Sequence, residues 1–98
     1  MKITATKTGA ETYRAAGVTT SIAALSKHLG VPCPRRLAEE EGDGKVCFFF
    51  EGICDKDPSK ICAFWDYKKG DITKNSIIDI SLFGPPEFLA FAQQVSNV

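Results

Sequence analysis

Three strand-like runs in the second half of the chain constrain its fold most. Each is short and rich in β-branched and aromatic residues, and they cover Lys45–Glu51, Lys60–Tyr67 and Asn75–Phe83. Turn-forming sequences separate them at Cys54–Ser59 and Lys68–Asp71. A parallel crossover would need roughly a dozen residues or more between strands. The short links therefore predict an antiparallel meander.

A short amphipathic helix is predicted before the meander, over about Thr20–Leu29. Ile22 and Leu25 begin an apolar stripe with helical spacing, and hydroxyl side chains at the start of the segment can cap the helix. Gly30 suits a C-terminal cap. Pro32 prevents the helix from continuing, because proline lacks the backbone N–H and restricts the residue before it.

A second helix is predicted after the meander, where Pro85-Pro86 ends the last strand and proline suits a first helical turn. Glu87 near its start is favoured by the helix dipole. One face of this helix is apolar and consists of Phe88, Phe91, Ala92 and Val95.

The N-terminal third carries weaker patterns. Alternation over Lys2–Thr8 predicts a short edge strand, and Glu11–Ala16 and Arg35–Glu41 are each predicted to form a helical turn. The fold class is therefore α+β: a three- or four-stranded antiparallel meander with two short helices packed on one face, in the order (β)-α-β-β-β-α. At 98 residues we expect a single domain over residues 1–98.

Alternation along each strand divides its side chains between two faces of the sheet. The wholly apolar sets are predicted to meet the helices and form the core: Val46, Phe48, Phe50, Ile61, Ala63, Trp65, Tyr67, Ile78, Ile80 and Leu82. The opposite face is predicted to mix apolar and acidic residues: Cys47, Phe49, Glu51, Cys62, Phe64, Asp66, Ile77 and Asp79. This second face is open unless the N-terminal segment or the Pro32–Glu41 connector folds over it.

The mixed face is the candidate partner-binding surface, because aromatic groups among carboxylates are typical of protein interfaces. The aromatic rings are expected to supply affinity and the carboxylates to supply steering and register. The residues predicted to contact a partner are Phe49, Glu51, Phe64, Asp66 and Asp79, with Glu39, Glu40 and Glu41 at the rim.

Charge is distributed unevenly along the chain, although the formal net charge is zero. Residues 1–36 contain six basic residues and one acidic residue, and residues 37–66 contain eight acidic residues and three basic ones. The acidic middle region predicts a protein partner with a basic surface. The zero net charge argues against direct nucleic-acid binding, although Arg35-Arg36 could touch an anionic surface.

The four cysteines, Cys33, Cys47, Cys54 and Cys62, are too widely spaced for the paired ligands of a typical zinc site. We expect reduced thiols, although Cys47 and Cys62 lie on one predicted face and could pair. His28 is the only histidine, and its place near a helix C-terminus explains it without catalysis. We therefore predict no metal, no cofactor and no catalytic residues.

No apolar segment in the sequence is long enough for a membrane span, and Met1–Ala10 lacks the apolar core of a secretory signal. We therefore expect a cytoplasmic protein with no membrane association, in the host cytoplasm if it is encoded by a phage.

Several short motifs resemble those of small accessory proteins carried by phages and mobile elements. They are Leu29-Gly30-Val31-Pro32, the Lys45–Glu51 run, Ala63-Phe64-Trp65-Asp66-Tyr67-Lys68, and Phe83-Gly84-Pro85-Pro86 with the final helix. Many proteins of this kind, anti-CRISPR proteins among them, inhibit host defence by occluding a site on a larger complex. The resemblance implies a way of acting and transfers no functional residues.

The sequence thus favours a non-enzymatic protein-binding module, of the kind that a phage uses to inhibit a host defence complex by steric occlusion. Two alternatives remain open. One is a small-ligand binder or cysteine-dependent enzyme with a pocket between helices and sheet. The other is a structural homodimer packed sheet to sheet, so that the chain is either a monomer or a homodimer.

Overall fold

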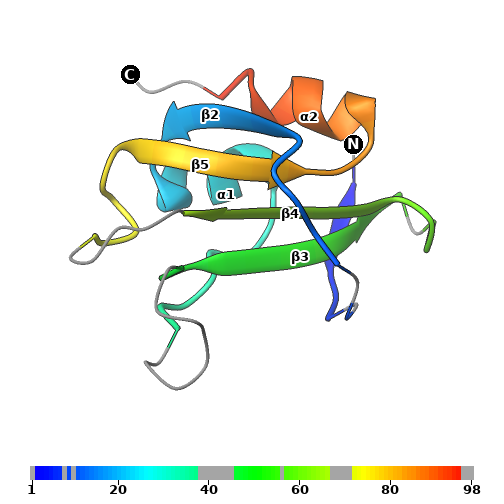
Figure 1. The fold of residues 1–98 in the computed structure, drawn as a ribbon, viewed down its shortest axis with the longest axis horizontal. Helices are drawn as coiled ribbons and strands as arrows, with labels where there is room; N and C mark the ends of the chain where they lie inside the picture. The colour runs from blue at the N-terminus through cyan, green and yellow to red at the C-terminus, as the bar shows by residue number, and fades with distance from the viewer. Residues whose placement is uncertain are drawn as a thin grey trace.

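A five-stranded antiparallel sheet in the order β1-β3-β4-β5-β2 organises the chain (Figure 1). The computed structural model describes residues 2–7, 9, 11–37, 46–55, 57–66 and 72–95. Its elements are β1 (Ile3–Ala5), β2 (Ala16–Thr20), α1 (Ile22–Leu29), β3 (Phe49–Cys54), β4 (Ile61–Asp66), β5 (Ile78–Phe83) and α2 (Pro86–Ala92). The predicted α+β class and the antiparallel β3-β4-β5 meander are confirmed, with five strands in place of three or four.

The additional strand is β2, which pairs with β5 along its whole length, from Ala16 opposite Leu82 to Thr20 opposite Ile78. The predicted helical turn at Glu11–Ala16 is wrong, because residues 11–15 form no helix and Ala16 begins a strand. A strand of β-branched residues beside β5 gains a full hydrogen-bonded ladder there, which local sequence patterns do not reveal. The predicted turn at Arg35–Glu41 is likewise not helical at residues 35–37, and its remainder lies outside the described residues.

Helix α1 ends before its predicted glycine cap and begins at Ile22, two residues after the predicted start, because Thr20 is the last residue of β2. The Ser21 hydroxyl accepts a hydrogen bond from the backbone N–H of Ala24 at 3.0 Å. Gly30 adopts a left-handed conformation with φ of 73°, and its N–H donates to the Lys27 carbonyl at 3.2 Å. Each end of the helix is therefore capped by a local contact, and the Ala23 N–H in the first turn donates to the distant Lys74 carbonyl at 2.8 Å.

The core lies on the sheet face that meets both helices. Ile22 and Leu25 from α1 and Phe88 from α2 are fully buried in one cluster with Phe64 and Leu82 of the sheet. Figure 1 is drawn from the opposite side, with α1 behind the sheet. We call the side facing the reader, which carries Phe49, Glu51 and Trp65, the outer face.

The predicted faces are confirmed for β5 and for Phe48 and Phe50, and they are wrong for β4. Phe50 lies opposite Phe64, and Phe64 lies opposite Leu82, so Phe64 belongs to the core face. Cys62, Phe64 and Asp66 are fully buried, while Trp65 lies half-buried on the outer face. Ala63 is also on the outer face but is covered there. Predicted core residue Tyr67 lies outside the described residues.

The inversion of β4 has an electrostatic explanation. The face of β4 that carries Trp65 is wholly apolar in sequence and is therefore predicted to be buried. The face that carries Asp66 is predicted to be open because it includes a carboxylate. Asp66 is nevertheless compensated, because its carboxylate accepts backbone hydrogen bonds from Cys47 at 2.9 and 3.1 Å and from Phe48 at 2.6 Å. A buried carboxylate with such partners is tolerated. Asp66 therefore supports the strand geometry and is not available to a partner.

Candidate functional site

An aromatic pair on the outer face is the centre of the candidate site. Phe49 of β3 and Trp65 of β4 lie directly opposite each other, with ring centroids 5.8 Å apart and planes tilted by 32°. Both side chains are half-buried, so each ring is partly open to solvent. Glu51, two residues along β3, points to the same face and is also half-buried. These residues combine aromatic surface with one carboxylate.

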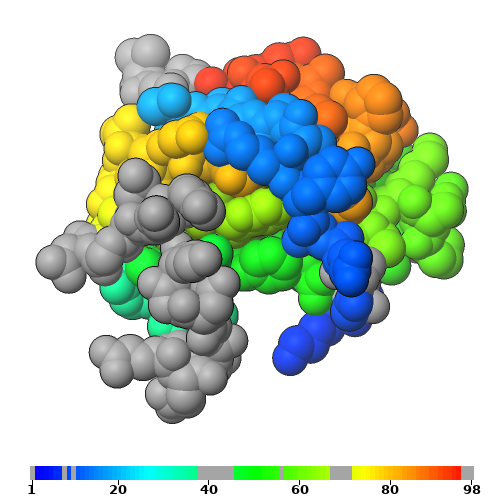
Figure 2. All heavy atoms as spheres, in the orientation of Figure 1, coloured from blue at the N-terminus to red at the C-terminus, as the bar shows by residue number. Residues whose placement is uncertain are grey.

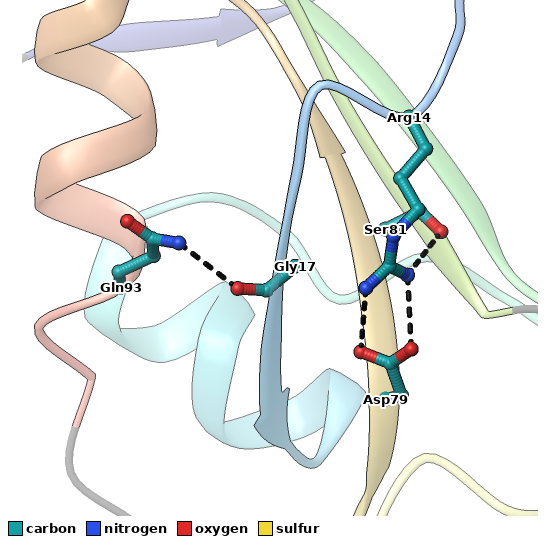
Figure 3. Close-up of polar contacts among 5 residues, drawn as sticks. All are labelled: Arg14, Gly17, Asp79, Ser81 and Gln93. Atoms are coloured by element: carbon teal, nitrogen blue, oxygen red, sulfur yellow. Dashed lines mark hydrogen bonds and ion pairs between the residues drawn. The ribbon is translucent and has the colours of Figure 1, made fainter.

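The N-terminal segment covers another part of the outer face, as the sequence left open. In Figure 1 the segment leading into β2 crosses the front of the sheet. The Tyr13 ring meets the Phe83 ring edge to face at a centroid distance of 4.9 Å. Arg14 donates to both carboxylate oxygens of Asp79, at 2.9 and 3.1 Å, and to the Ser81 hydroxyl at 3.0 Å (Figure 3). The open part of the face therefore lies toward β3 and the neighbouring residues of β4.

The second edge of the sheet is fastened as well. The Gln93 side-chain amide, just after α2, donates to the Gly17 carbonyl of β2 at 3.0 Å (Figure 3). Because this carbonyl points away from β5, the bond holds part of the outer edge of β2 to the end of α2. The contacts of Arg14 and Gln93 together fix β2 from both sides.

The predicted partner-binding residues divide into three groups. Phe49 and Glu51 lie on the outer face as predicted, and Asp79 is on that face but is paired with Arg14. Phe64 and Asp66 are fully buried on the core face, so their assignment to the partner-binding surface is wrong. The rim residues Glu39, Glu40 and Glu41 lie outside the described residues.

Sequence reasoning missed Trp65 and Arg14 as residues of this face. Trp65 was placed in the core because its strand neighbours on that side are all apolar, and only the compensation of Asp66 reverses the assignment. Arg14 reaches Asp79 across 65 positions of the chain, so no local pattern indicates the contact.

A groove of about 950 Å³ runs along the edge of β3. Ladder pairing with β1 covers Gly52–Cys54, and the Thr6 N–H donates to the Glu51 carbonyl, so the β3 edge opens into this groove before Glu51. The walls are Ala5–Lys7 on one side and the connector after α1 on the other, including Pro32 and Leu37. Figure 2 shows the molecule hollowed beside the dark-blue N-terminal segment. Phe49 therefore belongs to both the outer face and the groove.

A second hollow of about 480 Å³ adjoins the groove at Cys33, Pro34 and Arg35. Three cationic residues, Arg35, Arg36 and Lys74, contribute to its lining. The apolar part of its lining includes Pro34, Phe48 and Ile72. No acidic residue is found among the described residues that line this hollow.

The cysteines are all free thiols: Cys54 and Cys62 are buried, Cys47 is half-buried, and Cys33 is exposed. The pairing of Cys47 with Cys62, which the sequence left open, is absent, since Cys62 points into the core. Burial raises the pKa of the Cys54 thiol and, more strongly, the pKa of the Cys62 thiol, with which it shares a hydrogen bond. Both thiols are therefore protonated at neutral pH.

The single histidine joins the two helices. His28 lies in the last turn of α1, and its Nε2 donates to the Phe91 carbonyl at 2.7 Å while its ring stacks on the Phe91 ring at 4.5 Å. Within the described ranges, three or more His, Cys, Asp or Glu side chains do not gather at one place where they could bind a metal ion.

Comparison with protein-family models, with curated proteins and with solved structures found no match to this chain. In the part of the chain that the structure describes, neither helix has the length and apolarity needed to cross a bilayer.

Proposed function

We propose that the chain is a non-enzymatic protein-binding module whose contact surface is centred on Phe49 and Trp65. The observation that carries this proposal is the ring pair on the face that both helices leave open. Large aromatic side chains at the centre of an interface contribute more binding energy than most of their neighbours. Glu51 adds one half-buried carboxylate beside the pair.

The open surface around the pair is small. Ala63, opposite Glu51 in the register, and Ser81, opposite Trp65, are both buried, so a partner would meet the outer face at Phe49, Glu51 and Trp65. Aromatic anchors of this kind are typical of contacts with a folded protein. The resemblance to phage-borne accessory proteins makes steric occlusion of a site on a larger complex the mode of action that this proposal favours.

A paired substitution tests the proposal. Trp65→Ala with Glu51→Lys removes an anchor and reverses the adjacent charge without touching a fully buried residue. Glu87→Lys is the control, because it makes the same charge reversal at an exposed residue of α2, away from the outer face. Wild-type protein and the control should capture the same partner from a lysate of the natural host, and the paired variant should capture about a hundredfold less.

Two results would contradict the proposal. Equal capture by the paired variant would show that the outer face is not the contact surface. If light scattering finds a wild-type dimer and the paired substitution abolishes it, the outer face is a self-association surface. The melting temperature of each variant should be measured first, since a variant that unfolds would lose capture for another reason.

A further inference from the structure

The hollow beside the connector concentrates positive charge. Arg35 and Arg36 belong to the connector and Lys74 precedes β5, so the fold brings the cations together from two distant parts of the chain. Arg36 donates from Nη1 to the Ile72 carbonyl, and Arg35 donates from Nη1 to the Arg36 carbonyl at 3.2 Å. These bonds orient both guanidinium groups within the wall.

The adjoining groove adds apolar surface and one further cation. Leu37, Phe49 and Phe50 line it together with Pro32, and Lys7 stands on the opposite wall. Glu51 is the only acidic residue among the described residues that line either cavity, against the cations Lys7, Arg35, Arg36 and Lys74. The joined cavities therefore favour a ligand that is both apolar and negatively charged.

The edge of β3 also presents backbone groups to the groove. The backbone N–H of Cys54 donates to the Lys60 carbonyl, just before β4. In an antiparallel pair every second residue bonds to the same neighbouring strand, so every second residue of β3, counted back from Cys54, bonds to β4. Phe49 falls in the alternate set, whose backbone groups point away from β4. Glu51 belongs to the same set, and its carbonyl accepts from the Thr6 N–H at 3.2 Å. Beyond the Thr6–Glu51 bond, the β3 edge therefore offers a segment in the groove the backbone groups of Phe49, as one point for strand addition.

We propose that these joined cavities bind an extended acidic segment of a partner protein. An apolar side chain of the segment packs in the groove against Leu37 and Phe50, and carboxylates follow it toward Arg36 and Lys74. A peptide is favoured over nucleic acid because the chain has no net positive charge to hold a phosphate backbone. The inference uses other test residues than the outer-face proposal, so either can fail alone.

Selection from a random peptide library tests this site without knowledge of the natural partner. Wild-type protein should enrich peptides that combine at least one large apolar residue with several Asp or Glu residues. The best peptide, labelled with fluorescein, should bind in fluorescence anisotropy with an affinity that falls as salt rises. Lys74→Glu and Arg36→Glu should each weaken it about tenfold or more.

Lys2→Glu is the matched control, because it makes the same change of charge at the end of β1 that lies away from the groove. The Lys2 backbone bonds to Asp55 there. This variant should leave the peptide affinity within about twofold. Trp65→Ala should weaken it less than Lys74→Glu does, which separates this site from the outer face. Lys74→Glu carries the test if Arg36→Glu does not fold, because the Lys74 residue is exposed.

Four results would overturn the inference. The first is a selection with no acidic bias, and the second is an equal loss of peptide affinity in Lys2→Glu and Lys74→Glu. The third is tighter binding of a single-stranded oligonucleotide than of the peptide at 150 mM salt, about the physiological ionic strength. The fourth is enrichment only with a Glu39→Gln, Glu40→Gln, Glu41→Gln variant, which would make the chain's own acidic segment the occupant.

Discussion

The carboxylate of Asp66, at the end of β4, accepts a backbone hydrogen bond from Phe48 at 2.6 Å, just before β3 begins. The same carboxylate accepts from the neighbouring N–H of Cys47 through both of its oxygens. Asp66 is fully buried, so the contact replaces water around the charge with two backbone donors. It also fixes the point at which the chain enters β3, and therefore the position of Phe49 on the outer face.

Asp66→Asn should destabilise the fold by about 2–3 kcal/mol, because the amide has one acceptor oxygen and directs its NH₂ group at backbone donors. The free energy of unfolding can be measured by urea denaturation followed by tryptophan fluorescence. Asp79→Asn is the control, since the Arg14–Asp79 pair is largely exposed and should contribute at most about 1 kcal/mol. Equal effects of the two substitutions would contradict the role assigned to Asp66.

Thr20→Val should stabilise the fold by about 1 kcal/mol. The Thr20 hydroxyl oxygen is buried and has no hydrogen-bond partner among the described residues, so valine removes an unsatisfied polar group and keeps the same shape. Thermal unfolding checks the change. Thr4→Val, at an exposed position of β1, should change stability by no more than about 0.5 kcal/mol. A lower stability for Thr20→Val would mean that the hydroxyl makes a favourable contact.

Gly52→Ala should detach β1 from the sheet. A Cβ atom at Gly52 would lie 2.6 Å from the Thr4 carbonyl oxygen, and backbone cannot move aside as a flexible side chain does. We expect a loss of about 1–3 kcal/mol. Amide exchange of Thr6, whose N–H donates to Glu51, should become faster. Thr4→Ala changes only an exposed side chain and should leave this exchange rate unchanged.

Alkylation with iodoacetamide at pH 8, read by mass spectrometry, should modify Cys33 first and leave Cys54 and Cys62 unmodified in the folded protein. Burial raises the pKa of both buried thiols above the ordinary value of 9.0, so the reactive thiolate is scarce there. Their protection should persist as the pH rises to about 9 and disappear in urea. Rapid modification of a buried cysteine would instead favour the cysteine-dependent enzyme.

The same thiols affect the pH dependence of stability. Their pKa values are higher in the folded chain than in the unfolded chain, so their contribution is fully present below pH 9.0 and is lost as the pH rises above that value. Cys62→Ala should weaken this alkaline loss of stability. An unchanged alkaline slope would show that the thiol does not cause it.

Most elements of the fold could be predicted from local patterns. The helix α1 follows from Ser21 and Gly30, whose capping bonds reach only three residues along the chain. The β3-β4-β5 meander follows from short links between strand-like runs. The strand β2 could not be predicted, since Ala16–Thr20 is a strand only because β5 lies beside it.

The candidate site could be predicted only in part. Phe49 and Glu51 were assigned correctly because β3 alternates clearly between its two faces. The sequence predicts Trp65 in the core and Phe64 on the outer face, which is the reverse of the structure. Apolar residues occur on both faces of β4, and the Asp66 carboxylate indicates that its own face is open to solvent. The groove and the cationic hollow are built from segments far apart in the chain, so no window of sequence contains them.

The sequence by itself determined the two helices and the three strands of the meander, because capping, turn formation and alternation act between residues a few positions apart. The strand β2 needed β5 beside it. The tertiary structure decided which side of β4 is buried. That choice depends on Asp66 finding the backbone N–H of Phe48, 18 positions earlier in the chain. A carboxylate is costly to bury alone and tolerable when hydrogen-bonded, and only the folded chain supplies those donors.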